Sequence, residues 1–197
     1  MLEKYDTKAM FCLLGVNAEK YPELVRRIYN EGHLILNHGY SEKWALSMNN
    51  EDFLANLVDG ENAISAALGF NLDLKLYRPH GGFYKSRHEK IWTQNNWILV
   101  PATIRAHDAA ATSQKQDKIV KKVLKKAKKH GGGIILLHDA RGAYYNRDTN
   151  LEKKPDGVYN RSWIPETVEK IIISLIQNGF VLVNPNILYQ IENPEEL

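Results

Sequence analysis

The sequence contains a single cysteine, Cys12, among its 197 residues. One cysteine excludes an internal disulfide, and its position in the apolar run AMFCLL indicates a small buried side chain. No apolar run approaches the roughly 20 residues that a membrane-spanning helix needs. The first residues also lack the basic segment and long apolar stretch of a secretory signal peptide. We therefore expect no membrane span and no export signal in these residues, which taken alone indicate a cytoplasmic location.

An excess of charge of either sign is also missing. The net charge is +3, which is too small to predict a nucleic-acid partner. Hydrophobic residues make up 44% of the chain and charged residues 25%, as is ordinary for a globular protein. The length is sufficient for one domain with a sizeable core, so we expect residues 1–197 to form a single domain.

The basic residues concentrate in one segment, SQKQDKIVKKVLKKAKKH at 113–130, which contains eight lysines. Its apolar residues recur at the spacing of one helix face: Ile119, Val120, Val123, Leu124 and Ala127. Two interpretations remain open. The lysines form either the solvated side of a packed helix or a surface for an anionic polymer.

Apolar and amphipathic segments alternate along the rest of the chain. Strands are expected at 9–14, 34–37, 74–78, 97–101, 133–138 and 180–183. Helices are expected near 22–31, 51–68, 86–95, 114–129 and 165–178, with glycines 32, 69 and 179 as C-terminal stops and Asn50 as an N-cap. This alternation predicts a parallel α/β sheet or barrel. The one long irregular stretch, 139–163, is typical of a functional or mobile loop.

Chemistry in parallel α/β folds gathers where the strands end. Four of the seven histidines follow expected strands: His38, His80, His107 and His138. His38 and His138 also allow interpretations that involve no functional site. His38 is either an exposed loop residue or, with Glu42 four positions later, part of a metal site, although zinc needs at least three protein ligands. His138 is either a hydrogen-bonded core residue or a site residue, and Asp108 either caps a helix or pairs with His138.

The segment KYDTKAMFCLLGVNAEKYPELVRRIYNEGHLILNHGYSE resembles the opening of the polysaccharide deacetylases, also called NodB-homology proteins or family 4 carbohydrate esterases. YRPHGG, HDA, IILLHD and IPETVEKIIISLIQNGFVLV are similar to later segments of that family and occur in the same order. The resemblance implies a distorted (β/α)7-type barrel. It also implies a metal-dependent hydrolase, with zinc as the expected metal, that removes acetyl groups from an N-acetylated glycan.

By this resemblance, His38 is a metal ligand, and His138 is the general acid that Asp108 orients. Arg78 holds the catalytic base in such proteins. Glu42 and His80 are expected as substitute metal ligands. Substrate contacts are expected from Tyr40, from backbone amides at Gly81 and Gly82, from Leu136 at the acetyl methyl, and from Trp163. The loop 139–163, with its tyrosines and Trp163, either flanks the glycan groove or packs on its own base.

The sequence departs from the family at three points. A Thr-Phe-Asp-Asp segment supplies the base and one metal ligand in the family, whereas Met1 corresponds to a position after it. Glu42 replaces the second metal-binding histidine, and Arg105 stands where many members have an aspartate. We therefore expect a barrel lacking its first strand, with open edges that allow a homo-oligomer. The expected activity is weakened, and the alternative is an inactive glycan-binding or regulatory pseudoenzyme.

Overall fold

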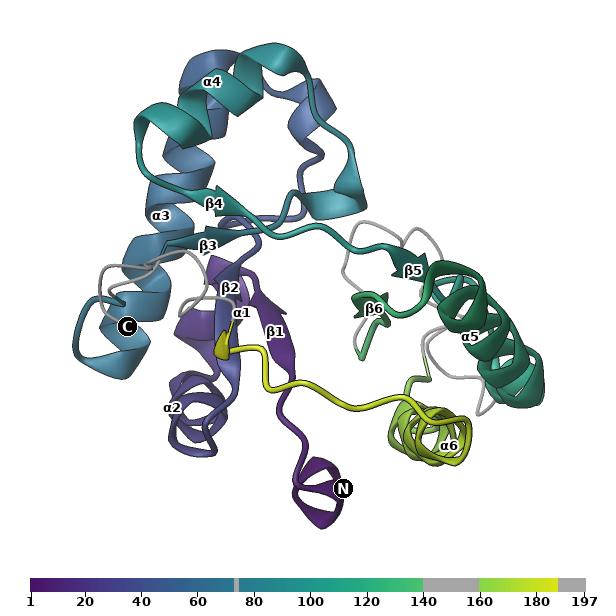
Figure 1. Cartoon of the computed structure of the whole chain (residues 1–197). Helices are drawn as coiled ribbons and strands as arrows, with labels where there is room; N and C mark the ends of the chain where they lie inside the picture. The colour runs from purple at the N-terminus through teal and green to yellow at the C-terminus, as the bar shows by residue number, and fades with distance from the viewer. Residues whose placement is uncertain (73–74, 140–159, 188–197) are drawn as a thin grey trace. The chain divides into compact units, whose positions relative to one another are not determined.

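The computed structural model of the chain describes residues 1–72, 75–139 and 160–187 (Figure 1). Contacts between residues divide the chain into two compact units. The β1–β4 unit comprises Lys8–Val100 and Val183–Leu197, and the α5–α6 unit comprises Met1–Thr7 and Pro101–Leu182. The expectation of a single domain stays a prediction.

The β1–β4 unit is built on a four-stranded parallel sheet in which the strands follow one another in chain order. The strands are β1 (Met10–Leu13), β2 (Leu34–Asn37), β3 (Leu76–Tyr77) and β4 (Ile98–Leu99). Helices connect them: α1 (Gly15–Lys20), α2 (Pro22–Asn30), α3 (Asn50–Leu68) and α4 (Ser86–Gln94). Parallel neighbours need such crossovers, which confirms the α/β interpretation of the sequence.

Helix α3 shows how local signals set the ends of an element. It begins after Asn49, whose side chain accepts a hydrogen bond from the Asp52 amide at 2.7 Å. The predicted N-cap, Asn50, was therefore wrong by one residue, because the preceding asparagine holds the extended conformation that a cap requires. The helix ends at Gly69, which has a φ of 87° and confirms the predicted glycine stop.

Helix α3 contributes to two apolar clusters of this unit. Ala63, Ile64 and Ala67 pack with residues of α2 and β2. Phe53 and Leu57 pack with residues of β3 and α4. Phe53 of the second cluster also stacks on a buried histidine.

That histidine is His88 in α4. Its ring is fully buried and stacks on Phe53, with 4.4 Å between ring centroids. His88 lies one helical turn before the buried Trp92 and so shares its buried face.

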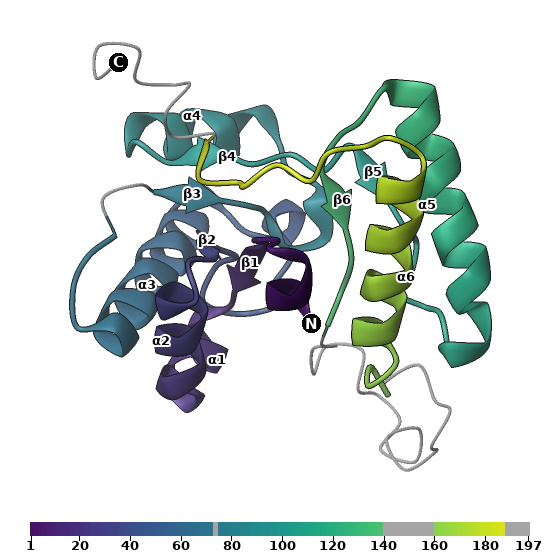
Figure 2. The same ribbon diagram turned by 60° about the horizontal axis from the view of Figure 1, so that its bottom comes forward.

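The α5–α6 unit contains β5 (Ile104–Arg105) paired in parallel with β6 (Ile135–Leu136). Helices α5 (Gln116–His130) and α6 (Ile164–Gln177) lie side by side (Figures 1 and 2). The buried residues of α5 are Ile119, Val123 and Ala127, which confirms the predicted apolar stripe. They join residues of α6 and β5 in one cluster.

Several strand predictions need correction. Residues 180–183 are not a strand, although Phe180 and Leu182 do pack on the apolar cluster of α5 and α6 while Val181 is 84% exposed. The alternation of packed and exposed side chains shows that the segment has one buried side. Among the described residues, however, it pairs with no other strand. Strand β5 was not predicted, because Ile104 lies between Thr103 and the charged Arg105, so no apolar run marks it.

The barrel prediction has a mixed outcome. The described residues form two sheets, of four and two strands, and no closed barrel. The parallel α/β class is confirmed. Pairing with a second copy through sheet edges stays a prediction. Among the described residues, no helix combines the length and apolar character needed to cross a bilayer.

Candidate active site

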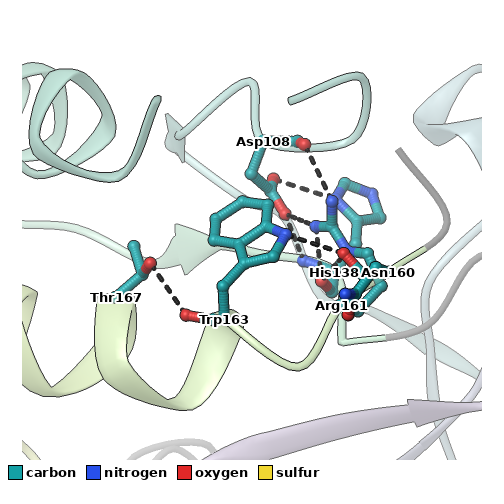
Figure 3. Close-up of polar contacts among 6 residues, drawn as sticks. All are labelled: Asp108, His138, Asn160, Arg161, Trp163 and Thr167. Carbon is teal, nitrogen blue, oxygen red and sulfur yellow. Dashed lines mark hydrogen bonds and ion pairs between the residues drawn. The ribbon is translucent and has the colours of Figure 1, made fainter. Parts of the chain in front are cut away.

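Two side chains meet at the carboxyl end of the β5–β6 sheet, Asp108 from the loop after β5 and His138 from the segment after β6 (Figure 3). The Nδ1 atom of His138 lies 3.0 Å from Oδ1 of Asp108, and the His138 backbone amide donates to Oδ2 at 2.8 Å. Between β5 and Asp108, His107 adopts a left-handed conformation with a φ of 60°. Parallel neighbouring strands end at one edge of the sheet, which brings the two side chains together.

Asp108 is therefore the partner of His138 and not a helix cap. Its side chain is fully buried, whereas that of His138 is 42% exposed. An ionised carboxylate only accepts hydrogen bonds, so Nδ1 of His138 carries a hydrogen. The other ring nitrogen, Nε2, is left to exchange protons with a ligand.

Arg161, which the sequence analysis did not select, completes this arrangement (Figure 3). Its Nη2 donates to Oδ2 of Asp108 at 2.5 Å and to the backbone oxygen of His138 at 2.7 Å. Nη1 donates to the Asp108 backbone oxygen, and Nε donates to that of His138, each at 3.1 Å. Arg161 thus connects both loops through one guanidinium, as the planar fork of arginine allows. No feature of the sequence marked Arg161, because the burial of Asp108, which calls for a cationic partner, is seen only in the structure.

The indole ring of Trp163 packs against the guanidinium of Arg161. The guanidinium carbon lies 4.8 Å from the indole centroid, and the indole N–H donates to the backbone oxygen of Asn160 at 2.7 Å. Trp163 is itself buried. Its predicted contact with a sugar stays a prediction. The neighbouring residues 140–159, on which the predicted groove loop depends, lie outside the described chain.

The electrostatics favour a charged aspartate. Burial alone would raise the pKa of Asp108, but the hydrogen bonds and charge of His138, with the charge of Arg161, outweigh burial and hold that pKa below its ordinary value. Asp108 therefore stays ionised at neutral pH. A carboxylate in that state stabilises a protonated imidazole at His138.

A second group of predicted residues lies in the β1–β4 unit, at the ends of β2 and β3. Nδ1 of His38 lies 2.7 Å from the backbone oxygen of Arg78, and the rings of His38 and His80 are 5.2 Å apart. A carbonyl oxygen only accepts, so Nδ1 of His38 carries the hydrogen and the lone pair of the neutral ring lies on Nε2. This orientation suits a metal ligand. Arg78 itself is buried and donates to the backbone oxygen of Val100 at 3.1 Å.

The residues of this unit that were predicted to contact substrate, Tyr40, Gly81 and Gly82, make contacts within the protein. The Tyr40 hydroxyl donates to Glu19 at 3.0 Å, a bond that raises the pKa of Tyr40. Gly81 and Gly82 both have a φ of 75°, and the Gly82 amide donates to the backbone oxygen of Pro79 at 3.0 Å. This tight turn forms a short 3-10 segment. Substrate contacts by Tyr40, Gly81 and Gly82, like that by Leu136 in β6, stay predictions.

The metal expected from the resemblance fits this unit only in part. His38 has the orientation of a ligand, His80 lies beside it, and Glu42 is half-buried nearby in the chain. However, the described residues contain no group of three or more His, Cys, Asp or Glu side chains that could hold a metal ion. Since zinc sites need at least three protein ligands, the described residues do not complete one.

Comparison with known proteins agrees with this fold. Residues 1–97 match the family profile described as polysaccharide deacetylase. A peptidoglycan-N-acetylglucosamine deacetylase of Bacillus cereus is 32% identical over 143 residues, which cover 73% of this chain and 50% of that protein. Two further Bacillus cereus deacetylases of the same description are 27% and 28% identical, and the matches cover 63% and 52% of their lengths. The chain thus spans between half and two thirds of these relatives.

Two solved structures extend the likeness. The crystal structure of a peptidoglycan N-acetylglucosamine deacetylase in complex with a benzamide derivative has a TM-score of 0.73 and 28% identity, covering 93% of this chain and 76% of that one. A family 4 carbohydrate esterase pseudoenzyme from Bacillus anthracis has a TM-score of 0.67 and 18% identity, covering 94% of this chain and 56% of that one. The second likeness shows the fold alone. In sequence and in fold, the chain is thus similar to the polysaccharide deacetylase family.

Proposed function

We propose that this chain is a hydrolase of the polysaccharide deacetylase type that removes acetyl groups from an N-acetylated glycan. The observation that carries the proposal is the buried, ionised Asp108 held between His138 and Arg161. A partly exposed histidine fixed in this way is suited to general acid catalysis.

The proton transfer follows from the hydrogen bonds. Hydrolysis adds water to the acetyl carbon and breaks its bond to nitrogen, so the departing nitrogen must gain a proton. His138 supplies that proton from Nε2, because its Nδ1 hydrogen is committed to Asp108. The negative charge of Asp108 stabilises the imidazolium before transfer, and Arg161 keeps both loops in place.

A divalent metal, zinc in the first place, would polarise the acetyl carbonyl in such a hydrolase. His38 is the residue best oriented to hold it, with His80 and Glu42 as further candidates. Because the described residues do not complete the site, we assign no step to the metal and no residue to water activation. For the same reason we expect slow turnover by the 197-residue chain.

The test is acetate release from N-acetylglucosamine oligomers over hours at high protein concentration, with zinc or cobalt added. We expect slow release by the unmodified chain and a loss of about 10²–10⁴-fold in His138→Ala, the usual contribution of a general acid. His130→Ala, which alters an exposed histidine at the end of α5, is the control. Equal rates for the two variants would refute the role of His138.

A second candidate is a glycan-binding or regulatory pseudoenzyme. It is favoured by the incomplete set of metal ligands among the described residues. Binding of the same oligomers measured by calorimetry, together with no acetate release at any metal concentration, would favour this candidate over the hydrolase.

A further inference from the structure

The charge of this chain is strongly localised on helix α5. Residues 113–130 contain eight lysines and one aspartate, a net charge of +7, whereas the whole chain carries +3. The remaining residues therefore carry a net −4. A protein that needed only solubility would not require its positive charge on one helix while the rest is acidic.

The lysines of α5 form an accessible stripe. Lys121, Lys125 and Lys128 are exposed and recur at i, i+4 and i+7, so they line one side of the helix. Among the described residues, the ion pairs of this unit engage Lys4, His138, Arg161 and Lys170 but not the lysines of α5. At about 1.5 Å per residue, the positive stripe from Lys121 to Lys128 extends over about 10 Å along α5.

The positive region reaches the loop that carries the candidate active site. Nζ of Lys126 donates to the backbone oxygen of Arg105, the last residue of β5, at 2.9 Å. The charge of Lys122, with burial and the charges of Lys126 and Arg105, lowers the pKa of His107. His107 is directly followed by Asp108, so the field of the lysines extends to the residue beside the site.

We propose that the lysine face of α5 is a docking surface for a linear anionic glycan, a polysaccharide with carboxylate or phosphate groups along its length. Charge complementarity defines the chemistry, and the stripe presents three exposed positive charges in succession to such a polymer. Multiple weak lysine contacts of this kind hold a polymer without fixing one register.

Other anionic partners fit this face less well. The apolar side of α5 packs against α6, so the helix has no apolar face to insert into a bilayer. The helix also contains no arginine, phenylalanine, tyrosine or tryptophan. Arginine forks and aromatic stacking are the usual means of binding nucleic acids, and α5 offers neither. An anionic glycan requires only the charges that are present.

The experiment compares two triple variants with the same change in charge. In K121Q/K125Q/K128Q the stripe is neutralised, and in K20Q/K43Q/K90Q three exposed lysines of the β1–β4 unit are neutralised. Glutamine keeps the helix propensity of lysine, so α5 is retained, which circular dichroism checks. Affinity for polygalacturonate, a carboxylate polymer, and for polyphosphate is measured by calorimetry at about 50 mM salt, where screening is weak.

We expect polygalacturonate affinity to fall at least tenfold in the α5 variant and less than threefold in the control. The unmodified chain should also lose affinity steeply as salt rises, and the α5 variant less so, because fewer counterions are released. A preference for polyphosphate would identify phosphate as the recognised group. Equal losses in both variants, or tighter binding of single-stranded DNA or anionic vesicles than of both polymers, would overturn the proposal. Binding does not require catalysis, so this outcome is separate from acetate release.

Discussion

His138 binds the carboxylate of Asp108 twice, through its backbone amide at 2.8 Å and through Nδ1 at 3.0 Å. The first bond fixes the end of β6 against the loop after β5. The second fixes which ring nitrogen of His138 is available for chemistry. One buried carboxylate thus determines both local structure and the protonation pattern of the candidate acid, so stability and function should respond together to changes at Asp108.

Replacing Asp108 with alanine should be strongly destabilising. The substitution leaves the guanidinium of Arg161 buried without its carboxylate, and breaking a buried ion pair on one side typically costs about 3–5 kcal/mol. Urea unfolding measures the loss. Asp117→Ala removes a carboxylate that is 82% exposed, and it should leave the unfolding midpoint unchanged. Similar midpoints for both variants would show that the Asp108 pair contributes no net stability.

The same carboxylate predicts an acid-sensitive fold. The pKa of Asp108 in the folded protein lies below that of an unfolded chain, which is about 3.9. Its contribution to stability is therefore fully present above that value and is lost as the pH falls through the folded pKa. As the pH decreases below about 4, we expect the free energy of unfolding of the unmodified chain to fall toward that of the Asp108→Asn variant. A constant difference between the two proteins from pH 7 to pH 2.5 would contradict this linkage.

Arg161→Lys should weaken the site while conserving charge. A single ammonium cannot replace a fork that donates to Asp108 and to the backbone oxygen of His138 at the same time. We expect a lower unfolding midpoint and a displaced NMR signal of the Nδ1 hydrogen of His138, which is bonded to Asp108. That signal separates positioning from a purely structural role.

The matched control for that variant is Arg26→Lys. Arg26 donates to the backbone oxygen of Ala67 at 2.7 Å, outside the candidate active site. It should lose some stability without affecting the NMR signal of the His138 Nδ1 hydrogen. If both variants leave that signal unchanged, Arg161 does not act on the histidine.

The Asp108–His138 pair could be predicted only as one of two alternatives for Asp108, which the resemblance to the deacetylases then favoured, because the strand before Asp108, β5, was not itself predicted. Arg161 could not, since it lies 53 residues from Asp108 and 23 from His138, and no local periodicity marks it. The segment 180–183 failed for a different reason. Its alternating apolar residues mark one buried side, and an extended segment that pairs with no other strand shows the same pattern.

Helix propensity favours replacing Gly60 with alanine, whereas the close packing around this glycine disfavours it. We expect the effect of packing to be the larger of the two. In an ordinary helix Gly→Ala stabilises by about 0.5–1 kcal/mol. Here an added Cβ would lie 2.6 Å from Oδ1 of Asn37 and 2.8 Å from the backbone carbon of Gly39, which flank His38. We expect Gly60→Ala to lower the free energy of unfolding, whereas Asn62→Ala, at an exposed position of the same helix, should not. A stabilised Gly60→Ala would show that the turn around His38 moves away easily.

Zinc binding tests the second group of residues independently of catalysis. His38 is oriented by the backbone oxygen of Arg78 with its lone pair on Nε2, and His80 lies beside it. With fewer than three ligands grouped among the described residues, we expect weak affinity for zinc, measured by calorimetry with the metal alone. His38→Ala should abolish this binding because it removes the best-oriented ligand, and Glu42→Ala should reduce it. His130→Ala, at an exposed position of α5, should retain the affinity of the unmodified chain. Unchanged zinc binding in His38→Ala would remove His38 from the metal site.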